Sequence, residues 1–262
     1  MPSSYCGPRD WLSLRQPKKD SHKGENGRLL ILAGSKQYHG SLILAIRAAV
    51  RFCDLVYVYC DEENRPLVRK LRANTPNIII LASSRALSSF LPRIDAVLAG
   101  PGWKADAKNG RLCSRLLKTK KPLVLDATAL RMLGRLRMHG KRLLHQNVLL
   151  TPHRGEFRIL FGREAASAPV RAMAKKYGCA ILAKGPIDYI ASASSFKINR
   201  VHHVGMTKGG SGDVLAGLCA ALLADHNTPF KVACAAAYLN GLAGVRLSRK
   251  MGAHYSSAAL AD

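Results

Sequence analysis

The stretch RLLILAGSKQYHGSLILAIRAAVRF, residues 28–52, contains the pattern that decides the fold. A short apolar run, residues 28–33, leads through a glycine-containing turn into a longer segment with helical spacing, residues 41–52. The apolar run has almost no polar interruption, which is typical of a strand buried on both faces of a sheet. A strand followed by a helix is the repeating unit of α/β proteins with mostly parallel sheets.

The same alternation continues along most of the chain. Helical patterns such as residues 110–120 and 169–178 lie between apolar runs, and two Ala- and Gly-rich helices are expected after residue 211. We therefore expect a single α/β domain over residues 1–262, with residues 1–26 as a polar N-terminal extension. Further strands are predicted over residues 55–59, 77–81, 95–100, 122–127, 147–151, 179–184 and 188–192.

Composition narrows the class of protein. With 262 residues, 48% of them hydrophobic, the chain can bury a sizeable core. It has no apolar run of the roughly 18 residues that span a membrane and no apolar signal-peptide region, so we expect a cytoplasmic protein with no membrane partner. The seven cysteines are odd in number and form no C-x-x-C pair. They predict neither a zinc site nor a disulfide framework.

The net charge is strongly positive, at +25, because the chain has 41 Lys and Arg residues and only 16 Asp and Glu residues. Such a balance points to anionic partners, and nucleic acid is the obvious one. However, the basic residues are spread over stretches such as 65–72 and 131–144, without an aromatic-interleaved basic motif. We expect no specific nucleic-acid partner, and a field that favours encounters with anionic substrates such as nucleotides.

Two glycine turns follow predicted strands. One contains Gly34 and Gly40, and the other is AGPGW, residues 99–103. Glycine lets the backbone approach a ligand, and ligands of open α/β sheets bind beyond the carboxyl ends of the strands. The first turn matches neither the P-loop nor the dinucleotide-binding template. Taken alone, each is better explained as an ordinary turn.

The segment LLTPHRGEF, residues 149–157, predicts a helix start. Thr151 can act as the N-cap, Pro152 as the first helical residue, and Glu156 as a partner of the positive end of the helix dipole. Capping does not explain His153, which is either a ligand contact or a solvated histidine.

The segment AKGPIDYI, residues 183–190, ends one strand at Lys184 and Gly185, and Pro186 turns the chain toward the next. This is either a β-turn beside a lysine whose stem packs on the surface or part of a nucleotide site.

The segment TKGGSGDVLAG, residues 207–217, places four glycines around Asp213. Its GGSG turn precedes a helix, and such a nest of N–H groups suits phosphate oxygens. Asp213 falls in the first helical turn, where an acid complements the helix dipole. An acid there also suits a base that takes a proton from a hydroxyl group undergoing phosphorylation.

In this order and spacing, the five segments resemble the ribokinase-like superfamily, and specifically its ADP/ATP-dependent NAD(P)H-hydrate dehydratases. The resemblance runs from about Gly27 to the end of the chain. Its most specific parts are TPHRGE, similar to the family's T-P-H-x-G-E, and GMTKGGSGDVLAG, similar to G-M-T-x-G-G-T-G-D-V-L-A-G. The resemblance implies a ribokinase-like three-layer sandwich, with a mostly parallel central sheet between two layers of helices.

The resemblance also implies a metabolite-repair reaction. A nucleotide, ADP or ATP with Mg²⁺, phosphorylates the ring hydroxyl of the S-epimer of hydrated NADH or NADPH, and loss of phosphate restores NAD(P)H. Asp213 would be the catalytic base and a substrate contact. Ser41, Gly102 and His153 would also contact the hydrated dinucleotide. The nucleotide would be bound by two groups of residues, namely Lys184, Gly185, Pro186, Ile187 and Asp188, and Gly210, Ser211 and Gly212.

Some positions depart from the family's pattern. Trp103 and Lys104 replace a small residue and its neighbour, so the resemblance does not determine the shape of the substrate channel. Thr128 stands where Asp is more common, and Ser41 and Ser211 stand where Ala and Thr are usual. The short N-terminus implies a dehydratase not fused to an epimerase. Family members often form tetramers, which implies a homo-oligomer.

Two alternatives stay open at this stage. A small-molecule kinase of the same superfamily, such as a vitamin kinase, would use the same glycine turn but stop at a phosphorylated product. TPHRGE disfavours it, because such kinases more often have Asn after T-P. A basic nucleic-acid-binding protein would account for the charge but for none of the five segments.

Overall fold

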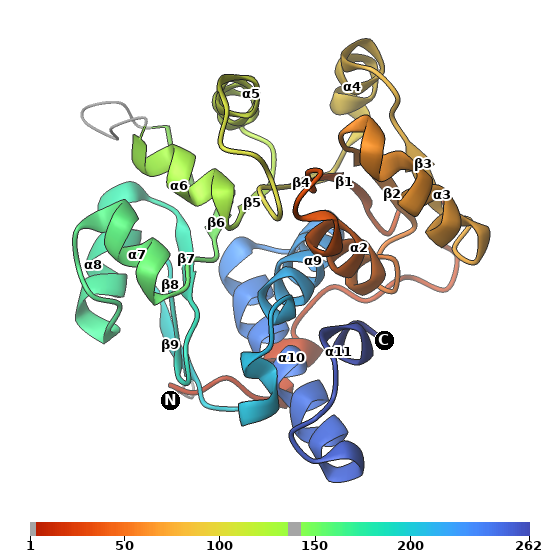
Figure 1. Cartoon of the computed structure of the whole chain (residues 1–262). Helices are drawn as coiled ribbons and strands as arrows, with labels where there is room; N and C mark the ends of the chain where they lie inside the picture. The colour runs from red at the N-terminus through yellow and green to blue at the C-terminus, as the bar shows by residue number, and fades with distance from the viewer. Residues whose placement is uncertain (1–3, 136–142) are drawn as a thin grey trace.

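The computed structural model describes residues 4–135 and 143–262. Residues 136–142 of the basic stretch 131–144 lie outside the described residues. Nine strands form one sheet in the order β3-β2-β1-β4-β5-β6-β7-β8-β9 (Figure 1). Strands β1 to β7 pair in parallel, whereas β8 and β9 are antiparallel. The predicted α/β class with a mostly parallel sheet is confirmed.

All eight predicted strands are present, with ends that agree to within two residues. The ninth strand, β9, was not predicted, because its sequence FKIN is short and only partly apolar. The strands are β1 (Arg28–Leu32), β2 (Leu55–Tyr59), β3 (Ile78–Ile80), β4 (Ala96–Ala99), β5 (Leu123–Leu125), β6 (Val148–Leu150), β7 (Ala180–Ala183), β8 (Asp188–Ala191) and β9 (Phe196–Asn199).

Helices cover both faces of the sheet and make the outer two layers. The described helices are α1 (Pro8–Leu12), α2 (His39–Ala49), α3 (Arg65–Ala73), α4 (Ser84–Phe90), α5 (Ala107–Lys118), α6 (Thr128–Arg135), α7 (Arg154–Phe161), α8 (Ser167–Tyr177), α9 (Ser211–Ala224), α10 (Pro229–Met251) and α11 (Ser257–Ala261). As predicted, α8 ends at Gly178, which adopts the left-handed conformation.

Strand alternation builds the two cores. Leu29 and Ile31 of β1 pack with α2, α9 and α10 on one face, whereas Leu30 and Leu32 pack with α5, α6 and α8 on the other. Both sets are fully buried, which explains why the strand sequences have no polar alternation.

Helices α2 and α9 pack unusually closely. A Cβ atom at Gly217 of α9 would lie 2.3 Å from the carbonyl oxygen of Ala45 in α2, so only glycine fits there. The Ala- and Gly-rich composition of α9 is therefore a packing requirement, and it holds the start of α9 close to the start of α2.

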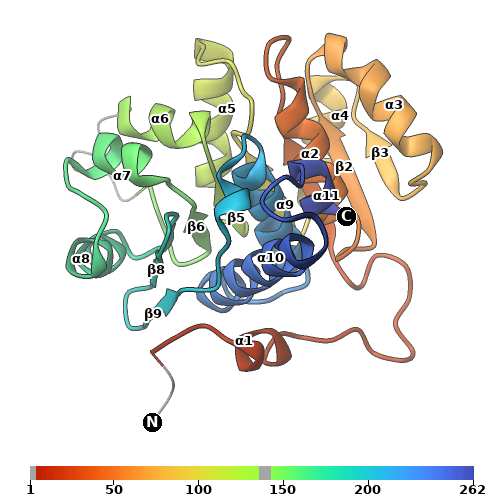
Figure 2. The same ribbon diagram turned by 60° about the horizontal axis from the view of Figure 1, so that its bottom comes forward.

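The N-terminal segment packs against the rest of the chain. The Cys6 amide donates to the carbonyl of Ile198, and α1 lies along α10 (Figure 2). Asp10 pairs with Lys197 at 2.7 Å. Among the described residues, no helix is long and apolar enough to cross a membrane.

Candidate active site

The carboxyl ends of the parallel strands meet at one edge of the sheet, and the polar segments singled out in the sequence lie there. Gly34, Gly100, Asp126, Thr151 and Lys184 each follow a strand within two residues. Backbone hydrogen bonds continue the ladder beyond the strands, from the Gly34 amide to Pro101 and from the Lys184 amide to Pro152. The sheet therefore fixes the relative positions of these side chains.

A buried ion pair lies at the centre of this edge. Lys184 Nζ is 2.7 Å from Asp126 Oδ1, and the two side chains are 16% and 3% exposed. The Thr151 hydroxyl lies 2.8 Å from the same carboxylate oxygen. Burial by itself would lower the pKa of Lys184, but the carboxylates of Asp126 and Glu156 outweigh burial and raise it. Lys184 therefore carries a permanent positive charge inside the site.

Asp213 occupies the first turn of α9 beside this pair. Burial and the negative charge of Asp126 raise its pKa from 3.8 to about 6, against the lowering effects of a hydrogen bond from Ser41 and of the Lys184 charge. The carboxyl group is thus a moderate base near neutral pH, with a hydroxyl donor and a cation nearby. A general base is most effective when its pKa is near the working pH.

The glycine turn before α9 is held in a defined shape. Gly210 has a φ of +97°, in the region that favours glycine. The Ser211 hydroxyl donates to the Lys208 carbonyl at 2.9 Å, and the Ser257 hydroxyl donates to Gly209 at 2.7 Å. A Cβ atom at Gly212 would lie 3.2 Å from Lys184 Nζ, so the helix start and the lysine face the same space. The first N–H groups of a helix have no acceptor within it, and these suit phosphate oxygens.

Gly102 brings the two glycine turns together. Its φ is +64°, and a Cβ atom there would lie 2.4 Å from the Tyr38 carbonyl oxygen and 3.0 Å from Ser41 Cβ. Gly102 and Ser41, predicted as substrate contacts, are therefore neighbours, and Ser41 connects them to Asp213.

The prediction that Thr151 caps a helix starting at Pro152 is wrong. Thr151 is fully buried and continues the sheet, with its amide donating to Leu125. His153 is the cap: its Nδ1 accepts from the amides of Gly155 and Glu156, and Glu156 Oε2 accepts from the His153 amide at 3.0 Å. Capping therefore does explain His153, although its side chain is 60% exposed beside Lys184 and can also meet a ligand.

The turn between β7 and β8 combines a fixed acid with an exposed backbone. Asp188 accepts hydrogen bonds from the Gly185 amide and the Asn199 side chain, at 3.0 and 2.9 Å, while burial raises its pKa. Gly185, Pro186 and Ile187 are exposed. Among the residues predicted to bind the nucleotide, the Lys184 ammonium group lies next to the backbone of Gly212. Residues 185–188 follow Lys184 on this turn.

The sequence reasoning missed Asp126 as a site residue and read Glu156 only as a helix-dipole partner. Asp126 follows β5, next to Thr151 at the end of β6, so an acid at the carboxyl end of a central strand was the available signal. Glu156 is 5% exposed, and its charge raises the pKa of both Lys184 and Asp213.

Two departures from the family's pattern contact each other. Trp103 is 6% exposed within the core formed with α5 and α6, and its carbonyl accepts from the Thr128 hydroxyl at 3.0 Å. Its indole is therefore a core side chain, whereas Lys104 is exposed.

A parallel sheet with a glycine-rich helix start and a carboxylate at its carboxyl edge defines the ribokinase-like class. A ribokinase-like protein of Enterococcus faecalis has this fold with a TM-score of 0.85 and 25% identity, over 95% of this chain and 88% of that chain. The Bacillus subtilis ADP/ATP-dependent NAD(P)H-hydrate dehydratase, co-crystallized with ATP and Mg²⁺, aligns with a TM-score of 0.80 and 25% identity, over 96% and 93% of the two chains.

Sequence comparison identifies the family. The family model for NAD(P)H-hydrate dehydratase matches residues 29–262. The ADP-dependent (S)-NAD(P)H-hydrate dehydratase of Nitrosopumilus maritimus is 36% identical over 92% of this chain and 88% of its own. That of Cenarchaeum symbiosum is 35% identical over 94% and 89%. The chain belongs to the NAD(P)H-hydrate dehydratase family, as its motifs predicted.

Proposed function

We propose that this protein is an ADP- or ATP-dependent dehydratase that converts the S-epimer of hydrated NADH or NADPH back to NAD(P)H. The observation that carries the proposal is the position of Asp213. Its partly buried carboxyl group, with a pKa of about 6, lies at the phosphate-binding start of α9, beside the cation of Lys184 and the hydroxyl of Ser41. The family membership and the relatives' activities support the same reaction.

Asp213 acts on the hydroxyl of the hydrated nicotinamide ring. Its carboxylate accepts the hydroxyl proton while that oxygen attacks the terminal phosphorus of the nucleotide. The bond from this phosphorus to the bridging oxygen breaks, and the rest of the nucleotide leaves as AMP from ADP or as ADP from ATP. The phosphorylated ring then loses phosphate, together with a proton from the neighbouring carbon, and the ring double bond forms. Gly102, Ser41 and His153 surround the ring, and the Ser41 hydroxyl holds the Asp213 carboxylate in place.

The phosphoryl group is stabilised mainly by fixed donors and charge. The amides of Gly210 and Gly212 donate to the transferring group, and Lys184 supplies positive charge beside Gly212. The Ser211 amide, proposed as a third donor, donates to the Lys208 carbonyl at 3.3 Å and would have to exchange this acceptor for the phosphoryl group. Lys184 through Asp188 hold the nucleotide, with the exposed apolar side chain of Ile187 against its base.

Magnesium fits this arrangement as a companion of the nucleotide. Among residues 4–135 and 143–262, no group of three or more His, Cys, Asp or Glu side chains is arranged to bind a metal ion. Mg²⁺ usually retains waters and binds through phosphates and one or two carboxylates. Asp126 and Glu156 are buried and already bonded, to Lys184 and to the His153 amide, so Mg²⁺ would be held mainly through the nucleotide phosphates, whose charge it would neutralise.

Neither alternative accounts for the observations as well. A vitamin-type kinase shares the fold, as the hydroxyethylthiazole kinase of Pyrococcus horikoshii does with a TM-score of 0.63 at 16% identity. The similarity to the dehydratases is much greater in sequence and extends over the whole site. A nucleic-acid-binding role leaves the Asp213 site unexplained. A cytoplasmic homo-oligomer, with a tetramer as one form it can take, remains part of the proposal.

The proposed activity is tested with purified protein, hydrated NADH or NADPH, Mg²⁺ and either ADP or ATP. We expect the near-ultraviolet absorbance of the dihydronicotinamide ring to recover with at least one nucleotide. Phosphate is released in equal amount, which separates a dehydratase from a kinase. If folded protein restores no absorbance with either nucleotide, the proposal is wrong.

The pH dependence of the reaction should follow the ionisation of Asp213. Because the base must be deprotonated, kcat/KM is expected to rise with pH and level off above about 6. The hydrogen bond from Ser41 lowers the pKa of Asp213, so the Ser41→Ala variant should require a higher pH to reach its plateau. Rates measured across the pH range with both proteins check this. An unchanged profile in Ser41→Ala would contradict the assigned hydrogen bond.

A further inference from the structure

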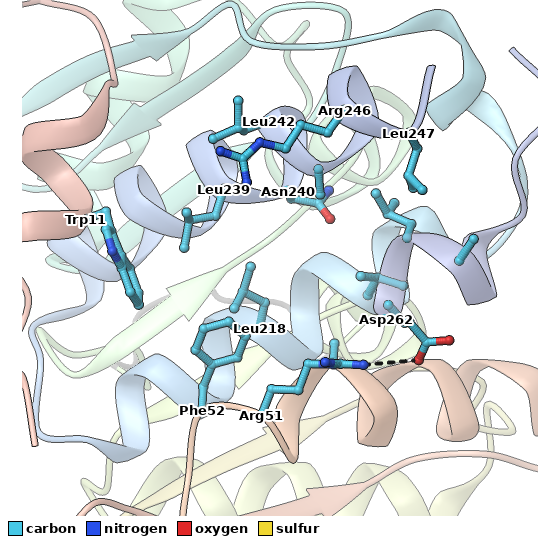
Figure 3. A pocket seen from close by; sticks show the side chains of 16 residues that line it. Trp11, Arg51, Phe52, Leu218, Leu239, Asn240, Leu242, Arg246, Leu247 and Asp262 are labelled. Atoms are coloured by element: carbon cyan, nitrogen blue, oxygen red, sulfur yellow. Dashed lines mark hydrogen bonds and ion pairs between the residues drawn. The ribbon is translucent and has the colours of Figure 1, made fainter. Parts of the chain in front are cut away.

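A cavity of about 480 Å³ lies outside the active site along the side of α9. Its walls come from α1, the end of α2, α9, α10 and α11 (Figure 3). Val214 and Leu218, one helical turn apart on α9, form its floor, whereas Asp213 lies at the sheet edge with the active site. The cavity volume is typical of small-molecule sites.

The lining is mostly apolar. Trp11 and Phe52 pack edge to face with ring centroids 6.1 Å apart. Leucines from α9 and α10 complete the apolar wall, at positions Leu218, Leu239, Leu242 and Leu247. A ligand of this cavity therefore needs an apolar body that is comparable in size to a few of these side chains.

One buried polar group in the wall is unpartnered. Asn240 of α10 is 6% exposed, and within the described part of the chain its side-chain amide makes no hydrogen bond. Figure 3 shows this amide facing the space between α10 and α9. The amide atoms of Asn240 keep contact with the cavity space, where a ligand or water can hydrogen-bond to them. Asn240 is therefore the polar contact that such a cavity offers a ligand.

The charges at the rim favour an anion at one end. Asp262 pairs with Arg47 and, at 3.4 Å, with Arg51, so its side-chain carboxylate offsets one of these two positive charges. Arg246, from the same helix as Asn240, lines the cavity and pairs with no acid in residues 4–135 and 143–262. A guanidinium group binds a carboxylate through two parallel hydrogen bonds.

We propose that this cavity binds a small amphipathic carboxylate, with its apolar tail between Trp11, Phe52 and the leucines and its carboxylate held by Arg246 and Asn240. One free guanidinium and one neutral amide suit a single negative charge. The inference does not depend on the proposed activity, because none of these residues belongs to the catalytic site.

Decanoate is a suitable probe for the wild-type chain, with binding measured by calorimetry and by the fluorescence of Trp11 in a Trp103→Phe background. We expect saturable binding of one decanoate per chain. Decylamine, which has the same tail and the opposite charge, should bind at least about tenfold more weakly, as one charge-assisted hydrogen bond would give.

Variants locate the site. Arg246→Gln should weaken decanoate binding about tenfold. Arg249→Gln, an exposed arginine one turn further along α10 but outside the cavity, should not. Asn240→Leu keeps the side-chain size and should weaken decanoate binding without affecting decylamine.

Three outcomes would overturn the proposal. Absence of saturable decanoate binding to the wild-type chain is the first. The second is equal weakening by Arg246→Gln and Arg249→Gln, which would indicate general charge attraction. The third is sedimentation that shows an oligomer disrupted by Ala243→Phe, with no decanoate binding to the oligomer, because this face would then be covered by a second copy of the chain.

Discussion

Asp213→Asn is expected to lower kcat by roughly a hundredfold or more, which is the typical contribution of a general base. Asn has the same size, can accept the Ser41 hydrogen bond through its amide oxygen, and occupies the same first turn of α9. The variant loses only the ability to take the hydroxyl proton. Single-turnover and steady-state rates measure the loss, and nucleotide binding should be largely kept.

The stability of Asp213→Asn distinguishes lost chemistry from lost structure. The folded-state pKa of about 6 lies above the ordinary 3.8, so ionisation of Asp213 destabilises the folded chain as pH rises through this range. An uncharged Asn avoids this cost, and we expect the variant to be more stable than wild type at pH above 6 by about 1–2 kcal/mol, discounted for partial solvent contact.

A matched control is Asp106→Asn. Asp106 caps α5 by accepting from the Asn109 amide at 2.9 Å, and Asn caps helices equally well. Its rate should equal that of wild type. If Asp213→Asn also turns over normally, Asp213 is only a helix-start residue and the mechanism is wrong.

Lys184→Met is expected to lower the free energy of unfolding by about 3–5 kcal/mol, because it leaves the buried carboxylate of Asp126 without its cation. The 2.7 Å ion pair has little solvent contact to compensate for the loss. Urea denaturation of both proteins at neutral pH measures the difference. Activity should fall as well, since the phosphoryl site loses its fixed positive charge.

A double variant tests whether the unpaired carboxylate of Asp126 causes the loss of stability in Lys184→Met. In Lys184→Met/Asp126→Asn the carboxylate that paired directly with Lys184 is removed, and the introduced amide oxygen can still accept from the Thr151 hydroxyl. We expect it to recover much of the lost stability but not the activity. Lys108→Met is the control, because Lys108 forms an exposed pair with Asp61 at 3.4 Å and should cost less than about 1 kcal/mol. Equal costs for Lys184→Met and Lys108→Met would refute the buried-pair explanation.

Much of the fold could be predicted because each central strand is buried on both faces. Runs such as residues 28–33 and 147–151 are apolar throughout, so local composition identifies them. The antiparallel β9 escaped prediction because its residues are only partly buried at the edge of the sheet. The N-terminal segment looked like a polar extension, yet Asp10 is held by Lys197, a partner 187 residues away that no local pattern reveals.

In the candidate site too, features that depend on neighbouring residues were predictable, whereas contacts between distant residues were not. The glycine turn and Asp213 were recognisable because both act through local backbone geometry at a helix start. Thr151 was misread as a cap, since its true partner is the carboxylate of Asp126, 25 residues earlier in the chain. Because the Thr151 backbone extends the sheet, the helix begins after it and His153 is the residue that caps it.

The sequence alone determined the class of fold, the family and the position of the candidate base, because these depend on residues close together in the chain. Only the tertiary structure decided the environment of that base. Burial beside α2 and the charges of Asp126, Glu156 and Lys184 set the pKa of Asp213, and those groups come from separate strands and helices. The electrostatics of a site depend on distances in space, which appear only when the carboxyl ends of the strands are brought together.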